Sequence, residues 1–260
     1  MSRSNNSISR RDFTAMAALL GGVSIAAPLS AQGFGDIMGS AKKIADAASY
    51  SDEEMKVFFD QMSADMDSKN PVAGPDDPYG QRLAALSQGL DSYDGLDLDI
   101  KAYLVSDVNA FAMANGTIRI FAGLMDEFTD DEVRYVVGHE IGHVQREHTK
   151  KRMQGALQRE AALSVAGTAD SKIGAIADSE LGKFFGDVIG AQHSQKHERQ
   201  ADDYAFEFMQ DNGYDAQACV TALEKLEAMS GGSGGGGLAA WTATHPSPKA
   251  RAKRMRKKLD

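Results

Sequence analysis

The chain has 260 residues, of which 42% are hydrophobic and 25% charged, and its formal net charge is -9. This acidic balance argues against nucleic acid as a partner, because phosphate binding needs a surplus of lysine and arginine. A lone cysteine, Cys219, excludes an internal disulfide, and the absence of an apolar run of about 18 residues predicts no membrane-spanning helix.

The first 31 residues have the order of features of an export signal. Arg10 and Arg11 precede a mildly apolar stretch from Thr14 to Ala27, which ends in small residues up to Ala31. This order resembles a twin-arginine signal peptide cleaved after Ala31; the alternative is a short buried helix that follows two arginines. The pattern therefore predicts export to the periplasm, and membrane association of the exported chain stays open.

Residues 32–70 are predicted to form a helical lead-in to a domain that spans residues 71–260. Small, acidic and basic residues recur there at helical spacing, and Ser51 and Glu54 form a capping box, a pair of side chains that closes the start of a helix. The loop NPVAGPDDPYG then separates this helix from a short one that ends near Gly89.

The clearest strand pattern lies in IKAYLVSDVNAFAMANGTIRIFAGLM. Apolar runs cover Ala102 to Val105 and Asn109 to Ala114, and residues 117–121 alternate in polarity after the turn Asn115-Gly116. An Asn-Gly turn between such runs is a strong signal for a hairpin. The sequence therefore predicts a small antiparallel sheet.

Helical patterns return after residue 129. Thr129 and Glu132 form a second capping box ahead of an apolar stripe, and the Ala/Gly-rich residues 155–190 are predicted to form loosely packed helices. Further helices are expected over 194–210 and 215–229, followed by a mobile glycine-rich loop over 231–248 and a basic last helix, whose run KARAKRMRKK is interpreted as a solvated face. Helices, a short sheet and more helices predict a mainly helical α+β fold in a single domain.

The helix after Thr129 contains VVGHEIGHVQREH. His139 and His143 stand four residues apart, so on a helix both project from one face and can reach one metal ion, with Glu140 beside them near a water on that ion. Gly138 and Gly142 are poor helix formers, each costing roughly 1 kcal/mol relative to alanine. Their presence predicts that another element packs close to this helix backbone.

A catalytic zinc needs a third protein ligand and an open position for water. Arg146 and Thr149 occupy the positions where a third histidine of a known spacing would stand. His148 lies nine residues after His139, about half a turn off the face if the helix continues. It is therefore a weak candidate, and a glutamate from a second helix is the better one.

The segment SQKHERQADDYAFEF offers such a glutamate. Glu198, Ala201, Asp202 and Ala205 share one helix face, on which the two alanines allow close approach of another helix. Glu198 can then complete the metal site, and Asp202 can orient a ligand imidazole through its ring N–H. The alternative is a charged, solvated helix face.

Two more histidines, His193 and His197, also stand four residues apart and form a rival metal pair. No glutamate is placed beside them as Glu140 is placed beside the first pair. We therefore expect both side chains at the surface.

These residues together resemble a known family. His-Glu-Ile-Gly-His at 139–143 and Glu-Arg-Gln-Ala-Asp at 198–202 are similar to the zinc metallopeptidases of the CAAX-prenyl-protease type, which are gluzincins, and the segments DVNAFAMANGTIRIFAGLMD and THPSPKAR resemble their small periplasmic LoiP-like branch. The resemblance implies one zinc ion per chain on His139, His143 and Glu198, with Glu140 as the catalytic residue. It also implies that a strand borders the cleft, made of Asn109, Ala110, Phe111 and Ala112.

The resemblance implies a zinc-dependent metalloendopeptidase that cleaves misfolded or envelope proteins in the periplasm, with Glu140 activating a zinc-bound water. Its partners would be polypeptide substrates, and peripheral association with envelope membranes or the outer-membrane assembly machinery stays open. The alternative is a non-catalytic chaperone or assembly factor that uses the same cleft. An intact Glu140 argues against that alternative, because a protein that only binds has no use for a base.

The segment GGSGGGGLAAWTATHPSP carries the only tryptophan, Trp241, and then His245 ahead of a proline. Next to a metal cleft, His245 on a mobile loop can occupy the open metal position and hold the enzyme latent, or donate a hydrogen bond to the oxyanion. Trp241 would dock the loop against the cleft wall. The alternative is a plain linker to the last helix.

Overall fold

The computed structural model describes residues 52–165, 190–230 and 238–260. The predicted signal peptide, residues 32–51 of the lead-in, the part of the Ala/Gly-rich region over 166–189 and the glycine run over 231–237 lie outside the described residues. None of the helices within the described ranges is both long and apolar enough to cross a lipid bilayer.

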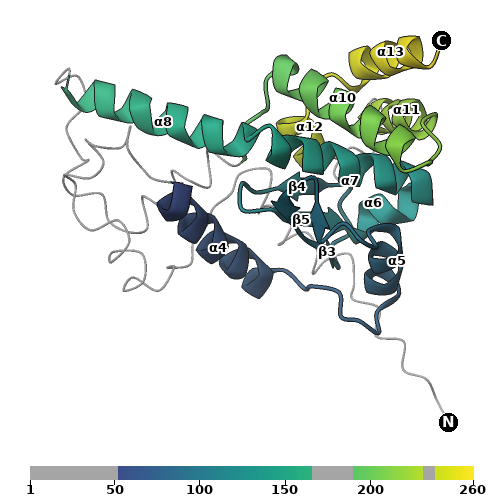
Figure 1. Cartoon of the computed structure of the whole chain (residues 1–260), viewed down its shortest axis with the longest axis horizontal. Coiled ribbons are helices and arrows are strands. Elements are labelled where there is room, and N and C mark those ends of the chain that lie inside the picture. The colour runs from purple at the N-terminus through teal and green to yellow at the C-terminus, as the bar shows by residue number, and fades with distance from the viewer. Residues whose placement is uncertain (1–51, 166–189, 231–237) are drawn as a thin grey trace.

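Helices make up most of the described chain, and two small sheets lie among them (Figure 1). The helices are α4 (Asp52–Lys69), α5 (Pro78–Leu86), α6 (Ala122–Glu127), α7 (Asp130–Gln145), α8 (His148–Val165), α10 (Gln195–Asp211), α11 (Ala218–Ser230), α12 (Ala239–Thr244) and α13 (Pro248–Leu259). The strands are β1 (Ser92–Tyr93), β2 (Leu96–Asp97), β3 (Asp99–Tyr103), β4 (Ala110–Ala112) and β5 (Thr117–Phe121). The predicted mainly helical α+β class is confirmed.

The larger sheet has the order β3-β5-β4. β4 and β5 form the predicted hairpin, with Phe111 opposite Arg119. β3 instead pairs in parallel with β5, with Asp99 opposite Thr117, so the expectation of an antiparallel sheet is wrong for this pair. The chain passes from β3 to the far side of the sheet, forms β4, and returns as the central strand β5. A local turn signal cannot reveal which strand becomes central.

Helix α7 runs between the sheet on one side and α10 and α11 on the other (Figure 1). Its capping box is formed as predicted: the Thr129 hydroxyl accepts from the Glu132 N–H, and the Glu132 carboxylate accepts from the Thr129 N–H. The apolar stripe on this helix is buried against both layers. Because α7 is enclosed, the polar side chains in its last turns are also buried.

The two glycines of α7 allow α10 to approach closely, as predicted. A Cβ atom at Gly138 would lie 2.5 Å from Cδ1 of Phe208, and one at Gly142 would lie 3.1 Å from Cα of Ala201. Real carbon atoms pack at about 3.5–4.0 Å. A side chain at either position would therefore separate the two helices.

The lead-in helix α4 is attached to the sheet by a buried arginine on β5. Arg119 is 1% exposed and donates hydrogen bonds to the carboxylates of Asp67 on α4 and Asp99 on β3. The hydroxyl of Tyr103 donates to the same Asp67 at 2.7 Å. Residues 52–69 are thus packed on the domain that follows them.

Candidate metal centre

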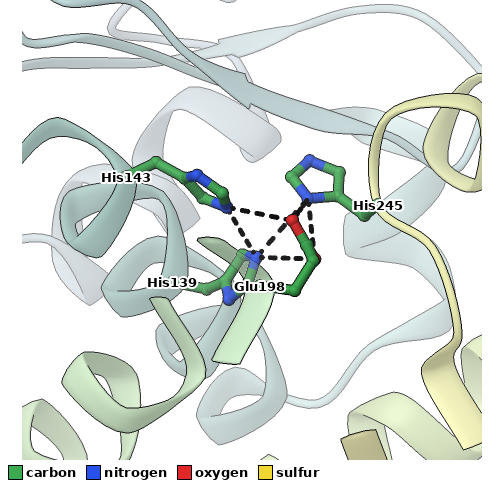
Figure 2. A group of neighbouring side chains, drawn as sticks. All are labelled: His139, His143, Glu198 and His245. Atoms are coloured by element: carbon green, nitrogen blue, oxygen red, sulfur yellow. Dashed lines mark hydrogen bonds and ion pairs between the residues drawn. The ribbon is translucent and has the colours of Figure 1, made fainter. Parts of the chain in front are cut away.

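Three elements bring four potential metal ligands together. His139 and His143 project from one face of α7, Glu198 comes from the first turn of α10, and His245 follows α12 (Figure 2). One nitrogen or oxygen atom of each lies within 4.8 Å of the others, and all four side chains are buried. The three residues predicted as ligands are therefore neighbours, and His245 joins them.

The spacing of these atoms fits a tetrahedral metal ion. Nε2 of His143 lies 3.1 Å from Nε2 of His139 and 3.4 Å from Oε1 of Glu198, and Nδ1 of His245 lies 3.3 Å from Oε1 of Glu198. Ligand atoms about 2.0–2.1 Å from a tetrahedral ion are separated by about 3.3 Å. Imidazole nitrogens and a carboxylate are also the donors that zinc prefers, so the residues present fit such an ion.

The electrostatics of His143 and Glu198 favour metal binding. Burial lowers the pKa of His143 well below its ordinary value, which keeps the imidazole neutral with a lone pair to share. Burial alone would raise the pKa of Glu198, but the charges of Arg251 and His245 outweigh burial and hold that pKa low. A neutral imidazole beside an ionised carboxylate is the form in which both residues bind cations.

Glu140 lies beside the ligand group and is 1% exposed. Its Oε1 is 3.6 Å from Nε2 of His245 and has no hydrogen-bond partner within the described part of the chain. Burial raises the pKa of this carboxyl group. A buried carboxylate with a spare oxygen and a raised pKa is suited to accept a proton.

Asp202 lies where the sequence predicts it, one turn beyond Glu198. Its Oδ1 is 3.1 Å from Nδ1 of His139, so it can hold the ring of that residue while Nε2 faces the other ligands. The hydroxyl of Tyr135 on α7 donates to the same oxygen at 2.8 Å. Tyr135 was not predicted as a site residue.

Arg251 on α13 is the second residue that sequence reasoning missed. Its guanidinium is buried between two carboxylates: Nη1 lies 2.6 Å from Oε2 of Glu198, and Nε and Nη2 donate to Asp202 at 2.9 and 2.7 Å. The interpretation of the basic run as a solvated face is wrong for this arginine. A signal existed, because Arg251 falls on the same helical stripe as the buried Ala252 and Met255.

The remaining histidines also lie near the site. His193 is 8% exposed, and its ring centroid lies 4.0 Å from that of His143. The expectation of a surface position is therefore wrong for His193. His197 is half-buried. The backbone N–H of His193 donates to the carbonyl of Thr244, which fixes the chain beside α12. His148 is outside the ligand group, but its Nδ1 lies 3.0 Å from Nδ1 of His143.

The segment predicted as a mobile loop over 231–248 contains the short helix α12. Trp241 on this helix is 1% exposed and stacks on the ring of His245, with centroids 4.2 Å apart. The ring of His245 thus lies between Trp241 and the other three members of the ligand group, a contact that a plain linker would not require. The stacking of Trp241 on His245 places α12 beside the ligand group.

Strand β4 lies at one end of the sheet order and contacts α7. The carbonyl of Asn109 accepts from the N–H of Phe121, and the N–H of Met113 donates to the carbonyl of Thr117. In an antiparallel pair, the backbone groups of alternate residues face the neighbouring strand. The backbone N–H and C=O groups of Ala110 and Ala112 therefore point away from β5. The carbonyl of Ala112 accepts from the Thr149 hydroxyl at 3.4 Å. Both alanines are buried in this structure.

The profile of peptidase family M48 matches residues 89–259. The metalloprotease LoiP of Escherichia coli K12 is 36% identical over 224 residues, which cover 86% of this chain and 87% of LoiP. The metalloprotease YcaL of the same strain is 34% identical over 214 residues, covering 82% and 83%. The β-barrel assembly-enhancing protease of that strain is 32% identical over 129 residues, covering 46% and 26%.

Proposed function

The chain belongs to peptidase family M48 and is a metalloprotease, and from this premise we propose that it is a zinc-dependent endopeptidase whose catalytic base is Glu140. The observation that carries the proposal is the buried Glu140 carboxylate, with its spare oxygen, beside the cluster of His139, His143 and Glu198. A protein that only binds metal would not need this carboxylate in that place.

His139, His143 and Glu198 would hold the ion. A Zn²⁺ ion bound there would polarise the peptide carbonyl and lower the pKa of the attacking water. Glu140 would accept one proton from that water while the water oxygen bonds to the carbonyl carbon. Glu140 would then pass the proton to the amide nitrogen as the carbon–nitrogen bond breaks, which releases a carboxylate and an amine.

The substrate would lie extended along β4. The outward peptide groups of Ala110 and Ala112 suit strand addition, in which a peptide continues the sheet through main-chain hydrogen bonds. Because both alanines are buried in this structure, the chain that covers this edge must move before a peptide can add. That requirement favours a closed state between rounds of cleavage.

We further propose that His245 keeps the closed state latent by taking the fourth metal position. Support comes from its Nδ1, which lies 3.4 Å from Nε2 of His139 and within the ligand group. The competing role, a donor to the oxyanion, needs the ring to leave the ligand group while staying in the cleft. The two roles predict opposite effects of removing the imidazole.

For location and substrates, we propose export to the periplasm and cleavage of envelope polypeptides. Support for export is the Arg10-Arg11 pattern with its apolar stretch and small exit residues. Support for the substrate class is the similarity to a protease named for β-barrel assembly. The mass of the mature N-terminus, with cleavage expected after Ala31, tests the first part.

The central experiment compares wild type with Glu140→Gln. We expect the variant to bind one Zn²⁺ per chain, as wild type does, but to lose casein cleavage, and Glu207→Gln on the exposed part of α10 serves as the matched control. Full activity of Glu140→Gln contradicts the proposal. Suppression of aggregation without chelator-sensitive cleavage in wild type would instead identify the chaperone alternative.

A further inference from the structure

The two metal-ligating histidines of α7 are supported in different ways. Nδ1 of His139 faces the carboxylate of Asp202, whereas Nδ1 of His143 faces Nδ1 of His148 at 3.0 Å. We propose that His148, backed by Gln200 on α10, is a positioning residue that sets the tautomer and the ring orientation of His143. This inference rests on the proposed role of His143 as a metal ligand.

A break between two helices brings His148 to this position. α7 ends at Gln145, and Glu147 has a φ of 54°, in the left-handed region that non-glycine residues rarely adopt. α8 then begins at His148 itself. On a continuous helix His148 would lie off the ligand face, so the left-handed residue is what turns its imidazole back towards His143.

The hydrogen bonds form a chain with one consistent direction. If Nε2 of His143 binds metal as a neutral imidazole, its Nδ1 carries the proton and must donate to Nδ1 of His148. His148 then carries its own proton on Nε2, which lies 3.2 Å from Oε1 of Gln200. An amide oxygen can only accept, so each donor in the chain meets an acceptor.

The surroundings hold the ring of His148 in place. Its side chain is 2% exposed, and its ring stacks on that of His197 with centroids 4.3 Å apart and planes inclined by 14°. An imidazole held in this plane keeps Nδ1 directed at His143 and Nε2 directed at Gln200.

The consequence is a different electronic environment for each ligand. A carboxylate partner increases the basicity of His139, whereas the imidazole and amide behind His143 orient the ring without adding negative charge. The site already encloses the carboxylates of Glu140, Glu198 and Asp202. A fourth carboxylate at position 148, where the side chain is 2% exposed, would add an uncompensated buried charge, whereas Gln200 is only half-buried.

The test uses two substitutions of similar polarity at residue 148. Asn places an amide oxygen where Nδ1 of the imidazole was, whereas Gln places its amide near the former Nε2 and leaves a methylene facing His143. We expect His148→Gln to weaken Zn²⁺ binding about 10- to 100-fold, the usual cost of losing such a partner. His148→Asn should lose less than about threefold. Zn²⁺ affinity is measured on the full chain by competition with a chromophoric chelator.

A second pair of variants tests the far end of the chain. Gln200→Glu keeps an acceptor for His148, whereas Gln200→Leu removes it, so only the leucine variant should weaken Zn²⁺ binding, by about tenfold. Gln210→Leu, at an exposed position on the same helix, is the matched control. In the zinc-loaded chain, nitrogen-15 NMR should show a protonated Nδ1 on His143 in wild type and His148→Asn.

Equal Zn²⁺ affinities in His148→Gln and His148→Asn, whether both normal or both weak, overturn the inference, because a packing role would not separate the two. A His143 that is protonated on Nε2 in the zinc-loaded wild type also overturns it. If wild type binds no Zn²⁺ at all, the proposed function itself fails. The outcomes are therefore distinguishable.

Discussion

Two segments, α12–α13 and α4, pack on the rest of the described chain, and the contact of each includes one buried arginine. The α12–α13 segment contributes Arg251, held between Glu198 and Asp202, whose side chains are at most 1% exposed. The α4 segment is held by Arg119, whose partners Asp67 and Asp99 remain 25% and 49% exposed. The same kind of ion pair is therefore fully buried in one place and partly hydrated in the other.

The difference lies in what happens when the arginine is lost. Water can solvate the partly exposed carboxylates beside Arg119, whereas the two beside Arg251 would be left as buried, unpaired charges. One of those two is a proposed metal ligand, and the other faces His139. We infer that α4 contributes to stability, whereas α12 and α13 contribute to both stability and the chemistry of the site.

The largest expected effect is that of Arg251→Met. Leaving buried carboxylates unpaired costs about 3–5 kcal/mol, so the free energy of unfolding should fall by this amount in urea titrations followed by circular dichroism. Wild-type stability in this variant would remove the distinction between the two arginines. Lys249→Met, at an exposed position on the same helix, is the control.

Arg119→Met should have a smaller effect on the free energy of unfolding. The charged hydrogen bonds it loses are worth about 1.5–3 kcal/mol, and hydration of Asp67 and Asp99 limits the loss. At a temperature where the variant is folded, its kcat/KM on casein should match wild type. A selective loss of kcat/KM in this variant would show that α4 also acts on the site.

His245→Ala tests whether α12 regulates the site. If the imidazole keeps about nine-tenths of the molecules latent, its removal should raise basal casein cleavage about tenfold. A fall in kcat would instead identify His245 as an oxyanion donor. An unchanged rate would reduce α12 to a structural element like α4.

The smallest expected effect is a pH dependence at the α4 junction. Burial alone would raise the pKa of Asp67, but hydrogen bonds from Arg119 and Tyr103 outweigh burial and lower it. A lowered folded-state pKa contributes stability above the unfolded value of about 4, and this contribution is lost as pH falls through the folded pKa. The stability difference between wild type and Arg119→Met should therefore shrink below about pH 4 in urea titrations. A constant difference would contradict this assignment.

Local patterns predicted α7 and the fold class because their signals lie within one element. The capping box, the two histidines and the two glycines all lie within α7, so the spacing along one helix is enough to predict them. The spacing along α10 predicts its face of carboxylates and small residues in the same way. Glu198 and Asp202 were predicted because their helix carries carboxylates and small residues at fixed spacing, and His245 was predicted because it follows a glycine run and the only tryptophan.

What the sequence could not give depends on contacts between distant segments. Arg251 is one cation in a basic run, and only its neighbours Glu198 and Asp202, about fifty residues earlier, distinguish it from the solvated ones. The ring of His193 lies beside those of His143 and His245, which are 50 residues before it and 52 after it in the sequence. The parallel pairing of β3 likewise depends on where β4 lies in three dimensions.

The close contact between α7 and α10 has a mechanical consequence for the metal site. A Cβ atom added at Gly138 would meet Phe208 at 2.5 Å and would have to displace it by about 1 Å to reach an ordinary contact. Metal–ligand bonds tolerate errors of only about 0.2 Å. Because metal ligands lie on both helices, the distance between α7 and α10 can change by less than the width of a methyl group before the site is distorted. The two glycines of α7, which carry only hydrogen in place of a side chain, permit this distance.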